Sequence, residues 1–175
     1  MRASTRLFAA VVTVVMSATA AAPLVNRDTL ASLEKSFDDS IFSQHADDPF
    51  DLLGNTRGVY LDDYGAVFTA EVNLVAGAVM TPFRPQFTDK QKEELRKKKV
   101  ARLAEVKALM RRMLVESAVA LKTMPPDQQI VVGVSLFYYS WEKRDQLPSQ
   151  IVMQAGRKTL VAGRDLDTAI RVQEF

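Results

Sequence analysis

The sequence predicts an α+β fold, with an antiparallel sheet of four to five strands in two hairpins, a long central helix and one or two shorter helices. Residues 68–74 alternate apolar and polar positions after a turn signal, as is typical of a half-buried antiparallel strand, and two further strands are expected close together after residue 129. Residues 88–122 instead repeat their apolar positions at helical spacing. The chain of 175 residues has no cysteine and 7 glycines, which excludes disulfide scaffolds and collagen-like repeats.

The first 22 residues have the three parts of a secretory signal peptide. Arg2 and Arg6 precede an apolar run over residues 7–16, and small residues follow up to Ala22. Cleavage is expected after Ala20 or after Ala22, and residues 23–175 then form a single domain in the periplasm or outside the cell. The run is about half as long as a membrane-spanning helix, so we expect no transmembrane span in the mature chain.

A first helix is expected over residues 28–43, because Leu30, Leu33, Phe37 and Ile41 recur at helical spacing. Asn26 or Asp28 is suited to cap its start. Residues 44–56 are rich in Asp, Asn, Gly and Pro, and they read as a loop.

Residues 57–75 are expected to form a hairpin. Asp63 to Gly65 would make a three-residue turn with the glycine in the left-handed region, which has no steric cost for a residue without Cβ. This register would place Arg57 opposite Glu71 as a cross-strand ion pair.

A long helix is expected from Thr88, which forms a capping box with Gln91, to about Lys122. Its apolar stripe begins at Leu103, because two cations occupy the preceding stripe positions. We therefore expect residues 89–102 to project from the core as a basic arm, which carries Arg96, Lys97, Lys98, Lys99 and Arg102.

The remaining elements are shorter. Residues 130–139 are apolar on both faces of a strand, so Val132, Val134 and Leu136 should be buried. A second strand is expected over 151–155, a short helix over 156–163 and a final strand over 170–175.

The densest aromatic run, residues 137–141, supplies the candidate ligand surface: Tyr138, Tyr139 and Trp141. Exposed rings can bind sugars, peptides or a protein partner. The alternative is that these rings are covered and that Trp141 closes the end of the sheet.

Motifs for catalysis are weak. The single histidine, His45, lies among Asp47, Asp48 and Asp51, and a solvated loop explains this group as well as a metal or acid–base site does. Asp62 and Asp63 fit a wet hairpin turn. No nucleophile or phosphate-loop motif is present, and we expect no metal and no cofactor. Glu71, Asn73 and Ser135 are interpreted as the wet side of the strands, with a polar site on one sheet face as the alternative.

The expected function is that of an exported, non-catalytic binding or assembly module. A hydrolase that uses acidic residues of the 45–71 region is one alternative, and a module that binds anionic surfaces through the basic helix 96–112 is another. A protein partner or self-association would use the basic helix or the aromatic strand. Nucleic acid is disfavoured, because Glu93, Glu94 and Glu105 dilute the basic patch.

Overall fold

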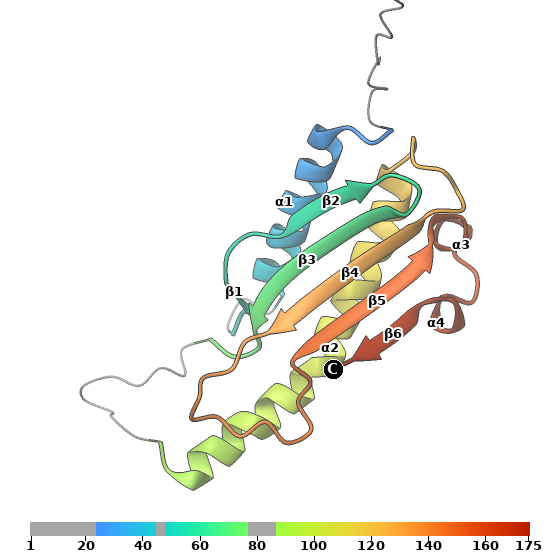
Figure 1. The fold of residues 1–175 in the computed structure, drawn as a ribbon. Helices are drawn as coiled ribbons and strands as arrows, with labels where there is room; N and C mark the ends of the chain where they lie inside the picture. Colours follow the sequence, from blue (N-terminus) through green and yellow to red (C-terminus); the bar gives the residue numbers. More distant parts are fainter. Residues whose placement is uncertain (1–23, 45–47, 77–86) are drawn as a thin grey trace, which may run out of the picture.

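The computed structural model describes residues 24–44, 48–76 and 87–175, and it has an α+β fold of two layers (Figure 1). Two helices, α1 and α2, cover one face of a six-stranded sheet, and no described element covers the other face. The elements in chain order are α1 (Arg27–Ser43), β1 (Asp51–Leu52), β2 (Arg57–Leu61), β3 (Gly65–Asn73), α2 (Asp89–Ala120), β4 (Gln129–Leu136), β5 (Gln150–Gly156), α3 (Arg157–Ala162), α4 (Leu166–Ala169) and β6 (Arg171–Glu174).

The sheet is mixed, so the expectation of a purely antiparallel sheet is wrong. The strand order is β1-β3-β4-β5-β6, and β2 also pairs with β3. β2–β3 and β4–β5 are the two predicted hairpins. They are joined by a parallel pair, β3–β4. Neighbouring parallel strands need a long crossover connection, usually a helix, and α2 supplies it between β3 and β4.

The core lies between the helices and the covered face of the sheet. Along β4, Val132, Val134 and Leu136 are 1%, 2% and 6% exposed, which confirms their predicted burial. Alternate residues of β3 and β5 join them, among them Phe68 and Met153. The other face of the sheet carries mostly half-exposed or polar residues, such as Val67, Thr69 and Gln154.

The helix α1 is amphipathic as predicted, and Asn26 caps it by accepting a hydrogen bond from the Asp28 N–H at 2.9 Å. Two of its acidic side chains accept hydrogen bonds from the backbone beside it. Glu34 accepts from the backbone N–H of Gly58 at 2.6 Å, and Asp38 accepts from that of Thr56 at 2.9 Å.

These contacts make α1 a substitute for a neighbouring strand along β2. Outward-facing amides of one strand edge recur every two residues, about 6.6 Å apart, and side chains four apart on a helix are about 6 Å apart. The spacing of the Glu34 and Asp38 carboxylates therefore matches the spacing of the Gly58 and Thr56 amides. Arg27 adds to this cap of α1 side chains on the β2 edge, because it donates to the Gly58 carbonyl at 3.0 Å and forms a two-point ion pair with Glu34.

The hairpin between β2 and β3 has a different register from the predicted one. Leu61 pairs with Gly65, so the loop is residues 62–64, and Arg57 lies opposite Thr69 instead of Glu71. The loop begins one residue earlier because Asp63 as well as Gly65 adopts a positive φ, at 62° and 135°. Gly65 then has a place in the sheet beside Gln129 of β4.

The helix α2 begins at the predicted capping box of Thr88 and Gln91 and ends at Ala120, two residues before the predicted end. Its first turns extend beyond the sheet (Figure 1), but the loop from β4 to β5 runs beside them. The expectation that residues 89–102 project freely is therefore wrong: Lys99 and Arg102 are 0% and 5% exposed. No helix of the described part of the chain is long and apolar enough to cross a membrane.

Two short elements were not predicted. β1 lies inside the expected loop 44–56, and α4 precedes the final strand. Both are too short to leave a periodic pattern in a sequence.

Candidate functional site

The candidate site is a polar notch in the open face of the sheet. β1 pairs with β3 at residues 72–73, and β2 pairs with it at residues 65–69. The chain between them, residues 53–56, leaves the sheet, and the gap is a pocket of about 250 Å³. The polar residues that line this notch are Asn55, Arg57, Thr69, Glu71 and Ser135, and its apolar residues are Leu53 and Ala70.

Local structure holds the notch open. The Leu53 N–H donates to the Glu71 carbonyl at 2.9 Å, and this bond ends the pairing of β1. Gly54 has a φ of 99°, a conformation suited to glycine, and it turns the chain outward. Thr56 is then bound to Asp38 of α1. The two sides of the notch are thus fixed to β3 and to α1.

The polar side chains of the notch are not used inside the protein. Among the described residues, none of the five forms a side-chain hydrogen bond or an ion pair. Within the described ranges, the Arg57 side chain acts only through its charge, as the smallest of the causes that lower the pKa of Glu34. Glu71 and Ser135 are register partners on β3 and β4. A cation, an anion, two hydroxyls and an amide therefore face one small volume and remain available to a ligand.

No protein-family model, curated protein or solved structure matches this chain. The chemistry of the protein's own surfaces is therefore the guide to its function.

The predicted aromatic surface is divided between two environments. Tyr138 is buried at 8% exposure and donates its hydroxyl hydrogen to the Pro148 carbonyl at 2.8 Å. Tyr139 and Trp141 lie together, with stacked rings whose centroids are 5.6 Å apart. The other stacking partner of Trp141 is Phe87, at 4.4 Å. Both neighbours use the flat faces that a sugar ring would need, while binding of a protein partner at the ring edges stays a prediction.

A buried charge cluster lies beneath this aromatic loop. Lys99 Nζ is 2.6 Å from the Glu142 carboxylate, and these side chains are 0% and 3% exposed. The same ammonium donates to the Phe137 carbonyl at 3.3 Å and lies 4.8 Å from the centre of the Tyr138 ring. Burial lowers the pKa of Lys99, although the bond to Glu142 opposes that effect. Burial also raises the pKa of Tyr138 to about 12, and the nearby Glu142 charge adds to it. All these groups are satisfied internally, so the cluster holds the loop on α2.

Most of the predicted basic arm is likewise used inside the fold. Arg96 binds Glu93 and the carbonyl of Asp145, and Lys98 lies 2.6 Å from the Asp48 carboxylate. Arg102 is buried, where it donates to the carbonyls of Leu74 and Asp48 and packs over the Phe50 ring.

The later basic residues of α2 are paired as well. Lys107 lies 2.6 Å from Glu174, and Arg112 donates to Gln44 at 2.8 Å. Lys97 is exposed, and among the described residues it forms no side-chain hydrogen bond or ion pair, although its charge helps to lower the pKa of Glu93. One unpaired lysine gives little support to the hypothesis that helix 96–112 binds an anionic surface.

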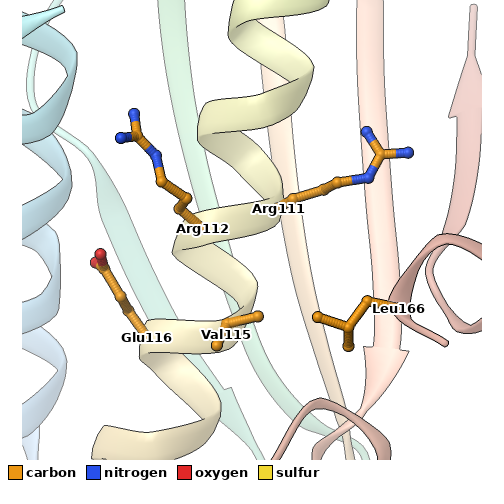
Figure 2. A pocket seen from close by; sticks show the side chains of 5 residues that line it. All are labelled: Arg111, Arg112, Val115, Glu116 and Leu166. Atoms are coloured by element: carbon orange, nitrogen blue, oxygen red, sulfur yellow. The ribbon is translucent and has the colours of Figure 1, made fainter. Parts of the chain in front are cut away.

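A second pocket, of about 320 Å³, lies on the outer side of α2 (Figure 2). Val115 and Leu166 point toward each other across it. The side chains of Arg111 and Arg112 point away to opposite sides, toward Asp167 and Gln44. Because its charged groups diverge, this pocket lacks the converging polar groups of a specific site.

The acidic residues of the hydrolase hypothesis do not converge. Asp62 lies in the hairpin loop and Asp51 is in β1, while Glu71 is the sole carboxylate that lines the notch. No group of three or more potential metal ligands occurs within the described ranges. His45 and Asp47 lie outside the described residues.

Sequence reasoning found part of the notch. Glu71 and Ser135 were grouped correctly on one sheet face, whereas Asn73 is buried and accepts from the Val75 N–H at 3.4 Å. Arg57 and Thr69 were missed as site residues because the predicted register used Arg57 to neutralise Glu71. Residues 53–56 leave the sheet because the strands on either side of them both pair with β3, and no local sequence pattern predicts that arrangement.

Proposed function

We propose that the protein is a non-catalytic binding module and that the notch is its ligand site. The observation that carries the proposal is the convergence of five polar side chains, from four segments of the chain, on one pocket without partners of their own. Surface polar groups usually bind water, but a concave group with both charges and neutral donors can fix the orientation of a small ligand.

The chemistry of the notch favours binding over catalysis. Acid–base hydrolysis commonly uses two carboxylates with separated pKa values, and one carboxylate lines this pocket. Among the lining residues, Glu71 is the one carboxylate near the hydroxyls of Thr69 and Ser135, and it forms no hydrogen bond with either of them. A ligand would therefore leave the site chemically unchanged.

Amide chemical-shift mapping tests the proposal. Acetate, methylammonium, glycine and glucose would be titrated separately into ¹⁵N-labelled protein. We expect at least one of them to shift the amides of residues 53–57, 69–71 and 133–135, to leave the rest of the sheet unmoved, and to be recovered intact. Shifts that are absent, or that are spread evenly over the surface, would contradict the proposal.

Export is a separate proposal. It rests on the tripartite pattern of residues 1–22, which lie outside the described residues.

A further inference from the structure

We infer that the notch binds small zwitterions of the α-amino acid class, with the ligand carboxylate at Arg57 and its ammonium group at Glu71. This inference rests on the proposed function of the notch, and it adds the chemical class of the ligand and its orientation.

The two charges of the notch are placed so that a ligand can lie between them. Arg57 lies opposite Thr69, and Glu71 is two residues further along β3 on the same face of the sheet. The Cα atoms of such diagonal positions are about 7–8 Å apart. Both side chains are long enough to reach toward a common centre from there. Arg57 and Glu71 form no ion pair with each other, so a ligand can lie between them. The ammonium and carboxylate groups of an α-amino acid are bonded to the same carbon atom, so both charges fit in the small space between Arg57 and Glu71.

A neutral hydroxyl group lies beside each of the two charges. Ser135 lies beside Glu71 in the sheet, and Thr69 faces Arg57. Each hydroxyl both donates and accepts hydrogen bonds, so each can complete the coordination of whichever ligand charge is nearer. Leu53 is 36% exposed and gives the notch one apolar wall. A small apolar side chain of the ligand fits against that wall.

The net charge of the notch matches that of a zwitterion. One cation and one anion line the notch, so a zwitterion leaves both of them neutralised. A ligand with a single charge leaves one partner unmatched in the pocket. Each matched ligand charge is expected to contribute roughly tenfold in affinity, which corresponds to about 1.4 kcal/mol.

The test compares L-alanine with two derivatives that each lack one charge, N-acetyl-L-alanine and L-alaninamide, by chemical-shift titration. We expect L-alanine to bind at least about tenfold more tightly than either derivative. Arg57→Gln should remove the advantage of L-alanine over L-alaninamide, and Glu71→Gln should remove its advantage over N-acetyl-L-alanine. This crossed pattern assigns each ligand charge to one residue.

Matched controls are available on the same protein. Arg171 is an exposed arginine of the open face on β6, and Asp62 is an exposed carboxylate of the hairpin loop. Arg171→Gln and Asp62→Asn should leave all three affinities within about twofold of wild type. Equal affinities for alanine and both derivatives would overturn the zwitterion inference and leave the binding proposal intact. Absence of binding by these three compounds and by the earlier panel would overturn both.

Discussion

The ion pair between Lys99 and Glu142 holds the loop that follows β4 against the first turns of α2. Both side chains are almost fully buried, and the ammonium also contacts the Phe137 carbonyl. Removal of one member of a buried pair leaves an uncompensated charge, which typically costs about 3–5 kcal/mol.

Lys99→Met should therefore lower the free energy of unfolding by about 3–5 kcal/mol, as measured by urea denaturation. The double variant Lys99→Met/Glu142→Met should recover most of this loss, because no charge is then left in the apolar environment. Lys97→Met is the control, since Lys97 is exposed two positions away, and it should change stability by less than about 0.5 kcal/mol. If Lys99→Met and Lys97→Met had the same small effect on stability, the loop would not depend on the buried pair.

Tyr138 is expected to be the last tyrosine to ionise. Its pKa is raised to about 12, mainly by burial, against an ordinary value of 10.0. The unfolded chain loses this proton near pH 10 and the folded chain only near pH 12, so stability falls as the pH rises between these values. The contribution lost is about 2–3 kcal/mol at most.

Ultraviolet absorbance titration measures this directly. Tyr138→Phe should remove the highest of the tyrosine transitions and should flatten the fall of stability above about pH 10. A wild-type titration in which all four tyrosines ionise together near their ordinary pKa would contradict the buried position of Tyr138.

At the scale of elements, the long periodic segments were predictable from sequence. α1, α2 and the hairpins follow from local spacing, and so do the caps at Asn26 and Thr88. The parallel β3–β4 pair was missed because strand neighbours are a tertiary property. The burial of Lys99 and Arg102 was missed because their partners, Glu142 and Asp48, come from distant loops. The same limit applies to the notch, which exists only where two strands share a third.

Gly65 is required by the junction between the hairpin and the parallel pair. Its φ is 135°, and a Cβ built on it would lie 1.9 Å from the Gln129 carbonyl oxygen. Gly65→Ala should therefore destabilise the protein by more than about 2 kcal/mol, because backbone strain and a backbone clash act together.

Gly54 provides the control for strain alone. Its φ is also positive, at 99°, but a Cβ there would meet no atom within 4 Å. Gly54→Ala should cost about 1–2 kcal/mol. Thermal or urea unfolding of both variants separates the two effects, and equal losses would show that the close approach to Gln129 contributes nothing.

The cap on the β2 edge should weaken in acid. Burial alone would raise the pKa of Glu34, but hydrogen bonds from Arg27 and the Gly58 N–H outweigh it, so the pKa is lowered below 4.5. A carboxyl with a lowered pKa contributes stability above its unfolded pKa. That contribution is lost as the pH falls from about 4.5 through the lower folded value.

Glu34→Gln should cost about 1–3 kcal/mol at neutral pH and should remove this part of the acid dependence. Asp39→Asn, at an exposed carboxylate of the same helix, should have neither effect. Stability curves of wild type and Glu34→Gln that run parallel from neutral pH to below pH 4.5 would contradict the role of the carboxylate.

At the scale of the whole molecule, the proposal of export predicts a shortened chain. Protein recovered from the periplasm or medium of a bacterial host should begin at Ala21 or Pro23, as measured by intact mass. A recovered chain that retains Met1 or carries a lipid adduct would contradict the proposed cleavage.

The helix cap on β2 also sets how this sheet can grow. A sheet edge with free amides is a growth front, where strands of further molecules can add to form a filament. α1 closes the front at β2 with side chains, whereas the opposite edge, β6, is limited mainly by its length of four residues. The two fronts therefore respond to different conditions. Acid should weaken the closure on the β2 side by protonating Glu34, and a return to neutral pH should restore it.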